Sequence, residues 1–192
     1  MLYVQQSLAP DEKLVHIGQF HWFYDVQAFM SIAWGLFFAI SLLIAAINLE
    51  PYLPGKMTIM SVAVEQGDSW LTQLRKIHPG IKLFALLLFL FGVFRFAQML
   101  VIKATTEIAV TTSRLIYKRG LVARFVGEIN IDRIEGVSVA QSFWGRIFNF
   151  GRLLVRGMGV GEMILPSIAN PLAFRRAIEK ARNVYEHDKR EI

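Results

Sequence analysis

Five arginines in the C-terminal half of the chain are the side chains best suited to bind a ligand: Arg114, Arg124, Arg146, Arg152 and Arg156. A guanidinium forms two parallel hydrogen bonds to a phosphate or carboxylate, so a basic rim of such groups would bind anionic lipid headgroups or an acidic partner. Arg152 and Arg156 would share one face of a strand, with Leu154 between them. Alternatively, some of these arginines pair with Glu128, Asp132 or Glu135 across a sheet, as weak surface ion pairs commonly do.

Arg95 interrupts an otherwise uncharged segment, residues 83–102. An ionisable side chain inside a membrane span marks a candidate functional contact with a partner. Arg95 also lies only about 10 Å of helix before Ile102. Its guanidinium can therefore reach the membrane surface beside Lys103 without any partner. Both interpretations stay open.

Other arrangements that perform chemistry are weak or missing in this sequence. The chain has no cysteine, which excludes disulfides, thiolate metal sites and cysteine nucleophiles. His16 and His21 are spaced so that they do not share a helix face, and no hydrolase, zinc-protease or P-loop motif is present. Residues 157–161 (GMGVG) precede a segment with strand character, whereas a dinucleotide-binding loop opens a helix. We therefore expect no metal, no cofactor and no enzyme activity.

The net charge of +6 belongs to the C-terminal part of the chain. Residues 1–102 carry six basic and six acidic side chains, whereas residues 103–192 carry fifteen and nine, and 15 − 9 gives the whole +6. Such a domain would attract anionic headgroups at a cytoplasmic membrane surface, although the same charge also keeps a surface soluble. Binding of single-stranded nucleic acid needs exposed rings among the arginines. We expect Phe125, Trp144 and Phe148 to be buried and predict no nucleic-acid partner.

Two apolar segments are the first elements that must position these side chains. Residues 26–49 contain no charge and residues 83–102 contain only Arg95; each is long enough to cross a bilayer core of about 30 Å. We predict two transmembrane helices, with residues 21–24 (HWFY) anchoring the first at the headgroup level. Residues 1–25 lack a signal-peptide pattern and are expected to form a cytoplasmic tail.

The loop between the spans, residues 50–82, should contain one short amphipathic helix. Trp70, Leu71, Leu74 and Ile77 have helical spacing, and Asp68 or Ser69 can cap the helix. This helix either lies on the membrane surface or packs on the end of the second span. The basic residues near the span ends orient the hairpin only weakly. The basic C-terminal domain favours a multi-pass protein of the cell inner membrane with both termini in the cytoplasm.

After Lys103 the apolar pattern changes from helical to alternating. Glycines separate short apolar runs, which predicts a small antiparallel sheet or barrel over residues 103–192. The runs include Leu115 with Tyr117, Val137 with Val139, Leu153 with Val155, and Met163 with Leu165. Asn170-Pro171 then gives a helix start. An apolar stripe from Phe174 to Tyr185 predicts a helix that covers the open end of the sheet.

Four segments of this domain resemble the bacterial pleckstrin-homology-like (bacterial PH) family of small membrane proteins with two transmembrane helices. Residues 111–120 (TTSRLIYKRG) are similar to its T-x-x-R-L-I-x-x-x-G opening, and residues 131–137 (IDRIEGV) to its I-x-x-I-x-x-V strand entry. Residues 141–151 (QSFWGRIFNFG) resemble its Q-S-x-x-G-R-I-F-x-Y-G segment, with Phe150 in place of Tyr. Residues 171–175 (PLAFR) match its helix start.

The resemblance implies a membrane helical hairpin followed by a PH-like antiparallel barrel or sheet with a C-terminal helical cap. We expect residues 143–150 to form a short helical turn whose aromatic side chains pack beneath the sheet.

The leading functional hypothesis is a non-enzymatic membrane-anchored scaffold that binds another protein or self-assembles, because the resemblance favours oligomers. A lipid-headgroup sensor using the basic rim is the second hypothesis. An accessory subunit of a transporter or membrane enzyme, contacted through Arg95, is the third.

Overall fold

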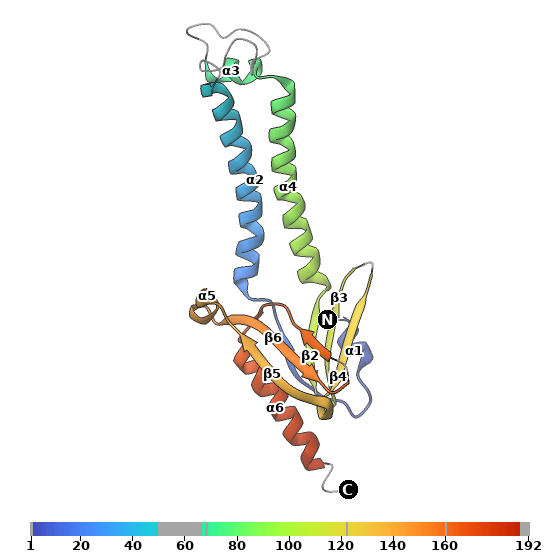
Figure 1. Cartoon of the computed structure of the whole chain (residues 1–192). Coiled ribbons are helices and arrows are strands. Elements are labelled where there is room, and N and C mark those ends of the chain that lie inside the picture. The colour runs from blue at the N-terminus through green and yellow to red at the C-terminus, as the bar shows by residue number, and fades with distance from the viewer. Residues whose placement is uncertain (1, 50–66, 68, 122, 160, 189–192) are drawn as a thin grey trace. The chain divides into compact units, whose positions relative to one another are not determined.

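The computed structural model describes residues 2–49, 67, 69–121, 123–159 and 161–188, which form two compact units (Figure 1). One, here called the sheet unit, consists of Met1–Asp25 and Val101–Ile192; the other, the hairpin unit, is Val26–Leu100. Residues 1–25 therefore do not form a separate tail, because they fold together with the C-terminal domain. Most of the predicted connecting loop, residues 50–66 and 68, lies outside the described residues.

Two helices, α2 (Trp22–Leu49) and α4 (Pro79–Thr105), are long and apolar enough to cross a membrane. They contain the two predicted spans: α2 extends the first at its N-terminal end, and α4 extends the second at both ends. With 28 and 27 residues, each is about 40 Å long, which exceeds the hydrocarbon core of a bilayer. Pro79 occupies the first position of α4, where its missing N–H is not needed.

Small residues line the contact between α2 and α4 inside the hairpin unit. The buried positions are Ala28, Gly35, Ala39 and Ala46 on α2, and Ala85 and Gly92 on α4. A Cβ atom on Gly92 would lie 2.6 Å from the carbonyl oxygen of Ser31, so only glycine allows this approach. The Ser31 hydroxyl donates a hydrogen bond of 3.2 Å to the Gly92 carbonyl. Close contact through small residues is the usual way in which membrane helices pack.

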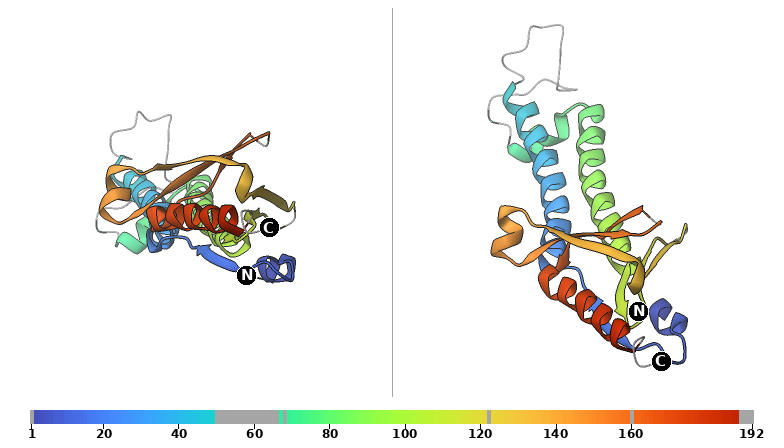
Figure 2. Two further views of the ribbon diagram at one scale, coloured as in Figure 1. Left: turned by 90° about the horizontal axis from the view of Figure 1, so that it is seen from below. Right: turned by 60° about the horizontal axis from the view of Figure 1, so that its bottom comes forward.

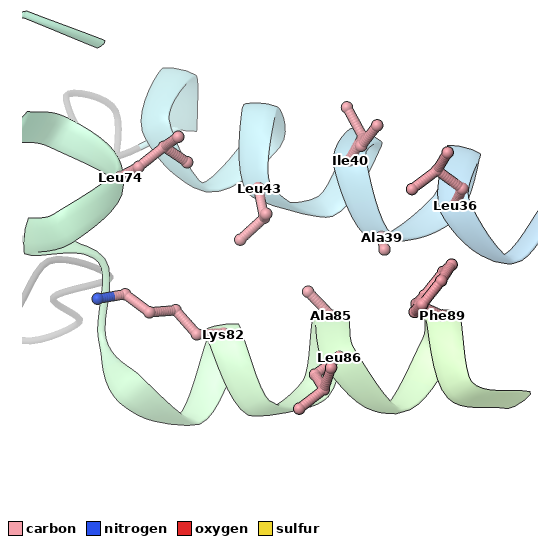
Figure 3. A pocket seen from close by; sticks show the side chains of 9 residues that line it. All are labelled: Leu36, Ala39, Ile40, Leu43, Leu74, Lys82, Ala85, Leu86 and Phe89. Atoms are coloured by element: carbon pink, nitrogen blue, oxygen red, sulfur yellow. The ribbon is translucent and has the colours of Figure 1, made fainter. Parts of the chain in front are cut away.

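A short helix, α3 (Trp70–Lys76), packs at the loop end of the hairpin unit. Leu74 and Ile77 contact Ala46 and its neighbours on α2, and Ile81 on α4, whereas Trp70 and Leu71 stay exposed. The helix thus packs on the ends of both spans rather than on the second alone. Below it, a groove of about 410 Å³ has an apolar lining interrupted by Lys82 (Figure 3).

The sheet unit contains two antiparallel sheets. The first has the order β1 (Leu14–Gly18), β2 (Glu107–Thr111), β3 (Arg114–Arg119) and β4 (Phe125–Asn130). The second has the order β5 (Ile134–Ala140), β6 (Phe150–Gly157) and β7 (Gly161–Ile164), and β8 (Ile168–Ala169) also pairs with β6. A 3₁₀ turn, η2 (Ile131–Arg133), connects the sheets, and a helix, α5 (Phe143–Ile147), connects β5 to β6.

The core lies between the inner faces of the two sheets. Ile108 and Leu115 from the first sheet meet Leu153 and Val155 from the second. The C-terminal helix α6 (Pro171–Asp188) lies between β1 on one side and β5 and β6 on the other (Figure 2) and adds Phe174 to this core. The predicted strands and capping helix are confirmed; the sheets form two layers and do not close into a barrel.

Strand β1 is the element that sequence reasoning missed. It pairs with β2 in antiparallel register, with Gly18 opposite Ile108. Gly18 also lies beneath Phe174, whose ring would be 3.1 Å from a Cβ at this position. The whole hairpin unit is therefore an insertion between two neighbouring strands. Only residues 19–21 separate β1 from α2, and only Thr106 separates α4 from β2.

This topology predicts which fragments fold. A chain that begins at residue 103 lacks β1, which leaves the edge of β2 unpaired and exposes Ile108 and Phe174 to water. We expect this fragment to aggregate. Residues 1–21 joined to residues 105–192 by a short Gly/Ser linker should fold, because the linker closes a hairpin between strands that are already paired. Circular dichroism and thermal melting test this, and cooperative melting of both fragments at the same Tm would contradict it.

Candidate functional site

Arg114 is the centre of a polar cluster that fixes the N-terminal segment to the first sheet. Its Nε and Nη2 atoms donate to the two carboxylate oxygens of Glu12 at 3.0 and 2.9 Å. Its Nη1 atom donates to Glu128 at 2.8 Å, and Nη2 also donates to the Ser7 carbonyl. The Glu12 side chain is 2% exposed, and it also accepts hydrogen bonds from the Thr111 hydroxyl and the Ala9 amide.

A second cluster holds the helix α1 (Leu2–Ser7) against the same face of the sheet. Glu107 accepts a hydrogen bond of 3.1 Å from Lys118 and one of 3.2 Å from the Val4 amide. The Lys118 ammonium also lies over the ring of Tyr3, 5.3 Å from its centroid. Val4 packs on Ala109 and Ile116 between the polar groups. The N-terminal segment thus covers the outer face of β2 and β3.

The pKa values of Glu12 and Glu107 are both lowered from the ordinary glutamate value. Burial alone would raise the pKa of Glu12, but hydrogen bonds from Thr111, Ala9 and Arg114 outweigh burial and lower the pKa below its ordinary value. The pKa of Glu107 is lowered against burial in the same way, chiefly by Lys118 and the Val4 amide. The hydrogen bond to Glu12 raises the pKa of Arg114. All these groups are therefore charged at neutral pH.

The predicted basic rim is not one site in this structure. Arg114 is committed to Glu12 and Glu128, which agrees with the interpretation that some rim arginines pair across the sheet. Arg124, Arg146, Arg152 and Arg156 are exposed, but they come from the β3–β4 connection, from α5 and from β6. Arg156 lies 3.8 Å from Glu162 on β7. Within the described part of the chain, Arg152 has no ion-pair partner.

Arg152 and Arg156 share the outer face of β6, as their spacing predicts. On the β5 side, the register places Ala140 opposite Arg152 and Gly136 opposite Arg156, so only small residues are their neighbours there. Arg95, the intramembrane candidate, is exposed on α4 of the hairpin unit. Among the residues that the structure describes, none forms a salt bridge with Arg95.

The aromatic residues around α5 are not buried beneath the sheet as predicted. Phe143 and Trp144 are 73% and 58% exposed, and Ile147 is 57% exposed. The reason is local: Gln141 donates from its side-chain amide to the carbonyls of Gly145 and Phe150 at 3.2 and 3.1 Å. These bonds fold the segment into a tight loop beyond the sheet edge, with its apolar side chains outside.

The loop packs on the first turn of α2, which belongs to the same unit. Phe23 stacks on Phe148 and Phe150 at centroid distances of 6.0 and 5.1 Å. Trp22 meets Phe148 edge-on at 5.7 Å, and Trp144 stacks on Phe148 at 6.0 Å. The aromatic group predicted for the start of the first span therefore continues into the α5 loop.

A groove of about 390 Å³ opens between β4 and β7, the edge strands of the two sheets. Tyr117, Ile129 and Met163 form part of its apolar lining, and Arg119 and Glu162 contribute opposite charges. A Cβ on Gly127 would lie 2.7 Å from the Met163 methyl group, so this glycine lets the β7 side chain reach β4. Phe125 and Ile164 border the groove and are 49% and 57% exposed.

Comparison with protein families identifies this arrangement. The model for the bacterial PH domain matches residues 14–187, from the first residue of β1 into the last turn of α6. The chain belongs to the bacterial PH domain family. Searches of curated proteins and of solved structures gave no match. The family match begins at β1, which agrees with the inclusion of this strand in the PH-like fold of the sheet unit.

Two polar clusters and one groove are therefore the positions of this bacterial PH domain that sequence reasoning did not identify. The sequence contains a signal for the Glu107 cluster. Glu107 shares a strand face with Ala109 and Thr111, and a carboxylate on a buried face needs a basic partner. No such signal marks Glu12, whose partner is 102 residues away. Among the described residues, no three or more His, Cys, Asp or Glu side chains are grouped so that they could hold a metal ion.

From the Glu12–Arg114 contact we predict how much Glu12 stabilises the fold and how this contribution depends on pH. Glu12→Gln should lower the free energy of unfolding at pH 7 by about 2 kcal/mol, because a buried charge-assisted hydrogen-bond pair is lost. Since the folded pKa of Glu12 lies below its ordinary value of 4.5, the contribution is complete above that pH and is lost as the pH falls through the folded pKa. Urea unfolding of the joined 1–21/105–192 chain measures both effects.

Glu179→Gln is the matched control for this measurement. Glu179 forms an exposed i,i+4 pair with Arg175 on α6, and such pairs contribute about 0.5 kcal/mol or less. Equal losses for the two substitutions, or a Glu12→Gln deficit that persists unchanged at pH 3, would contradict the role assigned to Glu12.

Proposed function

We propose that this bacterial PH-domain protein is a non-catalytic, membrane-anchored interaction module that binds an extended segment of a protein partner in the β4–β7 groove. The observation that carries the proposal is the pair of unpaired strand edges on either side of an apolar groove. Unpaired edges offer backbone donors and acceptors to an added strand. Strand addition of this kind obtains its affinity from the backbone and its specificity from side-chain pockets.

The chemistry of the groove describes the segment that would fit. An apolar side chain can occupy the space between Phe125, Met163 and Ile164. At the rim, Arg119 lies over the Phe125 ring at 5.1 Å, and Glu162 is half-exposed. An extended segment with an apolar residue flanked by charged ones would complement these groups. A second copy of the chain is one such partner and would produce the self-assembled form of the scaffold.

The short connections to α2 and α4 support a role at the membrane surface. Two apolar spans attached through residues 19–21 and Thr106 keep the sheet unit within a short chain length of the bilayer. We propose that the protein lies in the bacterial inner membrane with the sheet unit in the cytoplasm, because residues 103–192 carry the chain's net charge of +6 and a basic domain is attracted to the anionic cytoplasmic leaflet. Confinement to a surface raises the effective concentration of partners at that surface.

Photo-crosslinking in native membranes tests the groove. A photoreactive residue at Ile164 should give a discrete heavier adduct, whereas one at Leu172, an apolar exposed position on α6, should give none. Phe125→Ser in the Ile164-labelled chain should reduce the adduct several-fold, because it removes one apolar wall. An adduct of about twice the 21.9 kDa chain mass would identify self-assembly. Equal labelling at both positions, or none at Ile164, would contradict the proposal.

Headgroup binding by the outer face of β6 is the second candidate function. It is favoured by Arg152, which is exposed on the same strand face as Arg156. Reversing both charges in the joined 1–21/105–192 chain should weaken its binding to anionic vesicles at low salt more than tenfold, since each basic residue contributes about 1 kcal/mol. Vesicle flotation measures this. If reversal of Arg175 and Arg182 on α6 has the same effect, the attraction is diffuse and β6 is no headgroup site.

A further inference from the structure

Three large exposed apolar side chains of the sheet unit lie together on α5. Phe143, Trp144 and Ile147 occupy three of the five positions of this helix, and each is more than half exposed. Such a concentration of apolar side chains on one short element indicates an interaction surface. One of them is Trp144, and tryptophan is enriched where membrane and water meet.

The α5 loop is rigid enough to hold these side chains outward. Ser142 accepts a hydrogen bond of 3.1 Å from the Gly145 amide and begins the helix. A Cβ on Gly145 would lie 2.6 Å from the Phe150 carbonyl oxygen, so the loop closes tightly only with glycine at this position. Together with the two bonds from Gln141, these contacts prevent the exposed side chains from folding back onto the sheet.

Contacts inside the sheet unit connect α5 to the first turn of a membrane span. Trp144 stacks on Phe148, and Phe148 stacks on Phe23 and meets Trp22. These rings form one continuous aromatic group from the start of α2 to α5. Asp25, one turn further along α2, pairs with Lys103 near the end of α4 at 2.6 Å. An ion pair of this kind belongs in the headgroup region and not in the hydrocarbon core.

Basic side chains accompany the apolar ones. Arg146 is exposed within α5 itself. Arg152 lies opposite Ala140, the last residue of the strand that leads into α5. Apolar side chains next to guanidinium groups suit a surface that combines acyl chains with phosphates, as an anionic bilayer does.

We propose that α5 inserts Phe143, Trp144 and Ile147 into the bilayer interface as a third anchor of the protein, with Arg146 on lipid phosphates. The occupant of this surface is lipid, because the aromatic group is continuous with the residues at which a membrane span begins. The consequence is that the sheet unit is held in one orientation against the bilayer by an attachment in addition to its two chain connections. This anchor does not depend on partner binding in the β4–β7 groove.

Site-directed spin labelling of the full chain in anionic proteoliposomes tests the anchor. The chain contains no cysteine, so Ile147→Cys gives a single labelling site. Val184→Cys on α6 is the control, because it is an exposed apolar residue (41%) outside both α5 and the β4–β7 groove. Phe91→Cys, 65% exposed on α4, is the lipid-facing reference. Power saturation with oxygen, which partitions into lipid, and with a water-soluble nickel complex reports the surroundings of each label.

We expect the Ile147 label to be accessible to oxygen and several-fold less accessible to nickel than the Val184 label. Adding Phe143→Ser and Trp144→Ser to the Ile147-labelled chain should raise its nickel accessibility towards that of Val184, because the apolar drive for insertion is removed. High nickel accessibility at Ile147 in the otherwise unchanged chain would mean exposure to water. Low accessibility to both reagents would mean cover by protein. Either result would overturn the proposal, and neither bears on crosslinking at Ile164.

Discussion

The antiparallel pairing of β1 with β2 is the constraint on which the rest of this structure depends. The two strands are neighbours in the sheet, but all of the hairpin unit lies between them in the sequence. The chain must therefore return to the side of the membrane from which it left. Two spans of nearly equal length, 28 and 27 residues, satisfy this condition. The Asp25–Lys103 ion pair then joins the helix ends at the sheet unit. A long insertion of this kind costs little stability, since loop-closure entropy grows only with the logarithm of length.

Pairing alone would leave the outer face of the first sheet open, and two ionic clusters cover it. Arg114 on β3 bonds Glu12 from the N-terminal segment and Glu128 from β4. Glu107 on β2 bonds the Val4 amide from the N-terminal segment and Lys118 from β3. Buried charges of this kind stabilise a fold only when every member is paired, since an unpaired one carries its full desolvation cost. No buried side-chain nitrogen or oxygen atom lacks a hydrogen-bond partner among the described residues. The clusters therefore select one position for the N-terminal segment as well as stabilising it.

The parts of this fold that the sequence predicts are those with a local signal. The two spans are visible as uncharged runs, the later strands as alternation between glycines, and α6 as an apolar stripe after Asn170-Pro171. Strand β1 has no comparable signal, because its partner is β2, far along the chain, and five residues with a central His16 show little alternation. The contact between Arg114 and Glu12 gives no sequence signal either, because 102 residues separate the two. From the basic composition of the domain, Arg114 was predicted to belong to an exposed rim.

The wrong prediction at α5 has a different physical origin. A rule that relates hydrophobic residues to burial must also take the bilayer into account as an apolar environment. Large aromatic side chains avoid water, and in a protein surrounded only by water this means burial in the core. A chain attached to a bilayer has another apolar phase within reach, and a loop beside the start of a span can transfer its rings to the interface instead. The loop closes tightly at Gly145, where a Cβ would lie 2.6 Å from the Phe150 carbonyl oxygen, with Trp144 exposed beside it. Exposed Ile164 has no such neighbours, because the rings of Trp22 and Phe23 contact α5 and not β7. Ile147 and Ile164 are equally exposed, and the two proposals assign them different surroundings for this reason: lipid for Ile147 and a protein partner for Ile164.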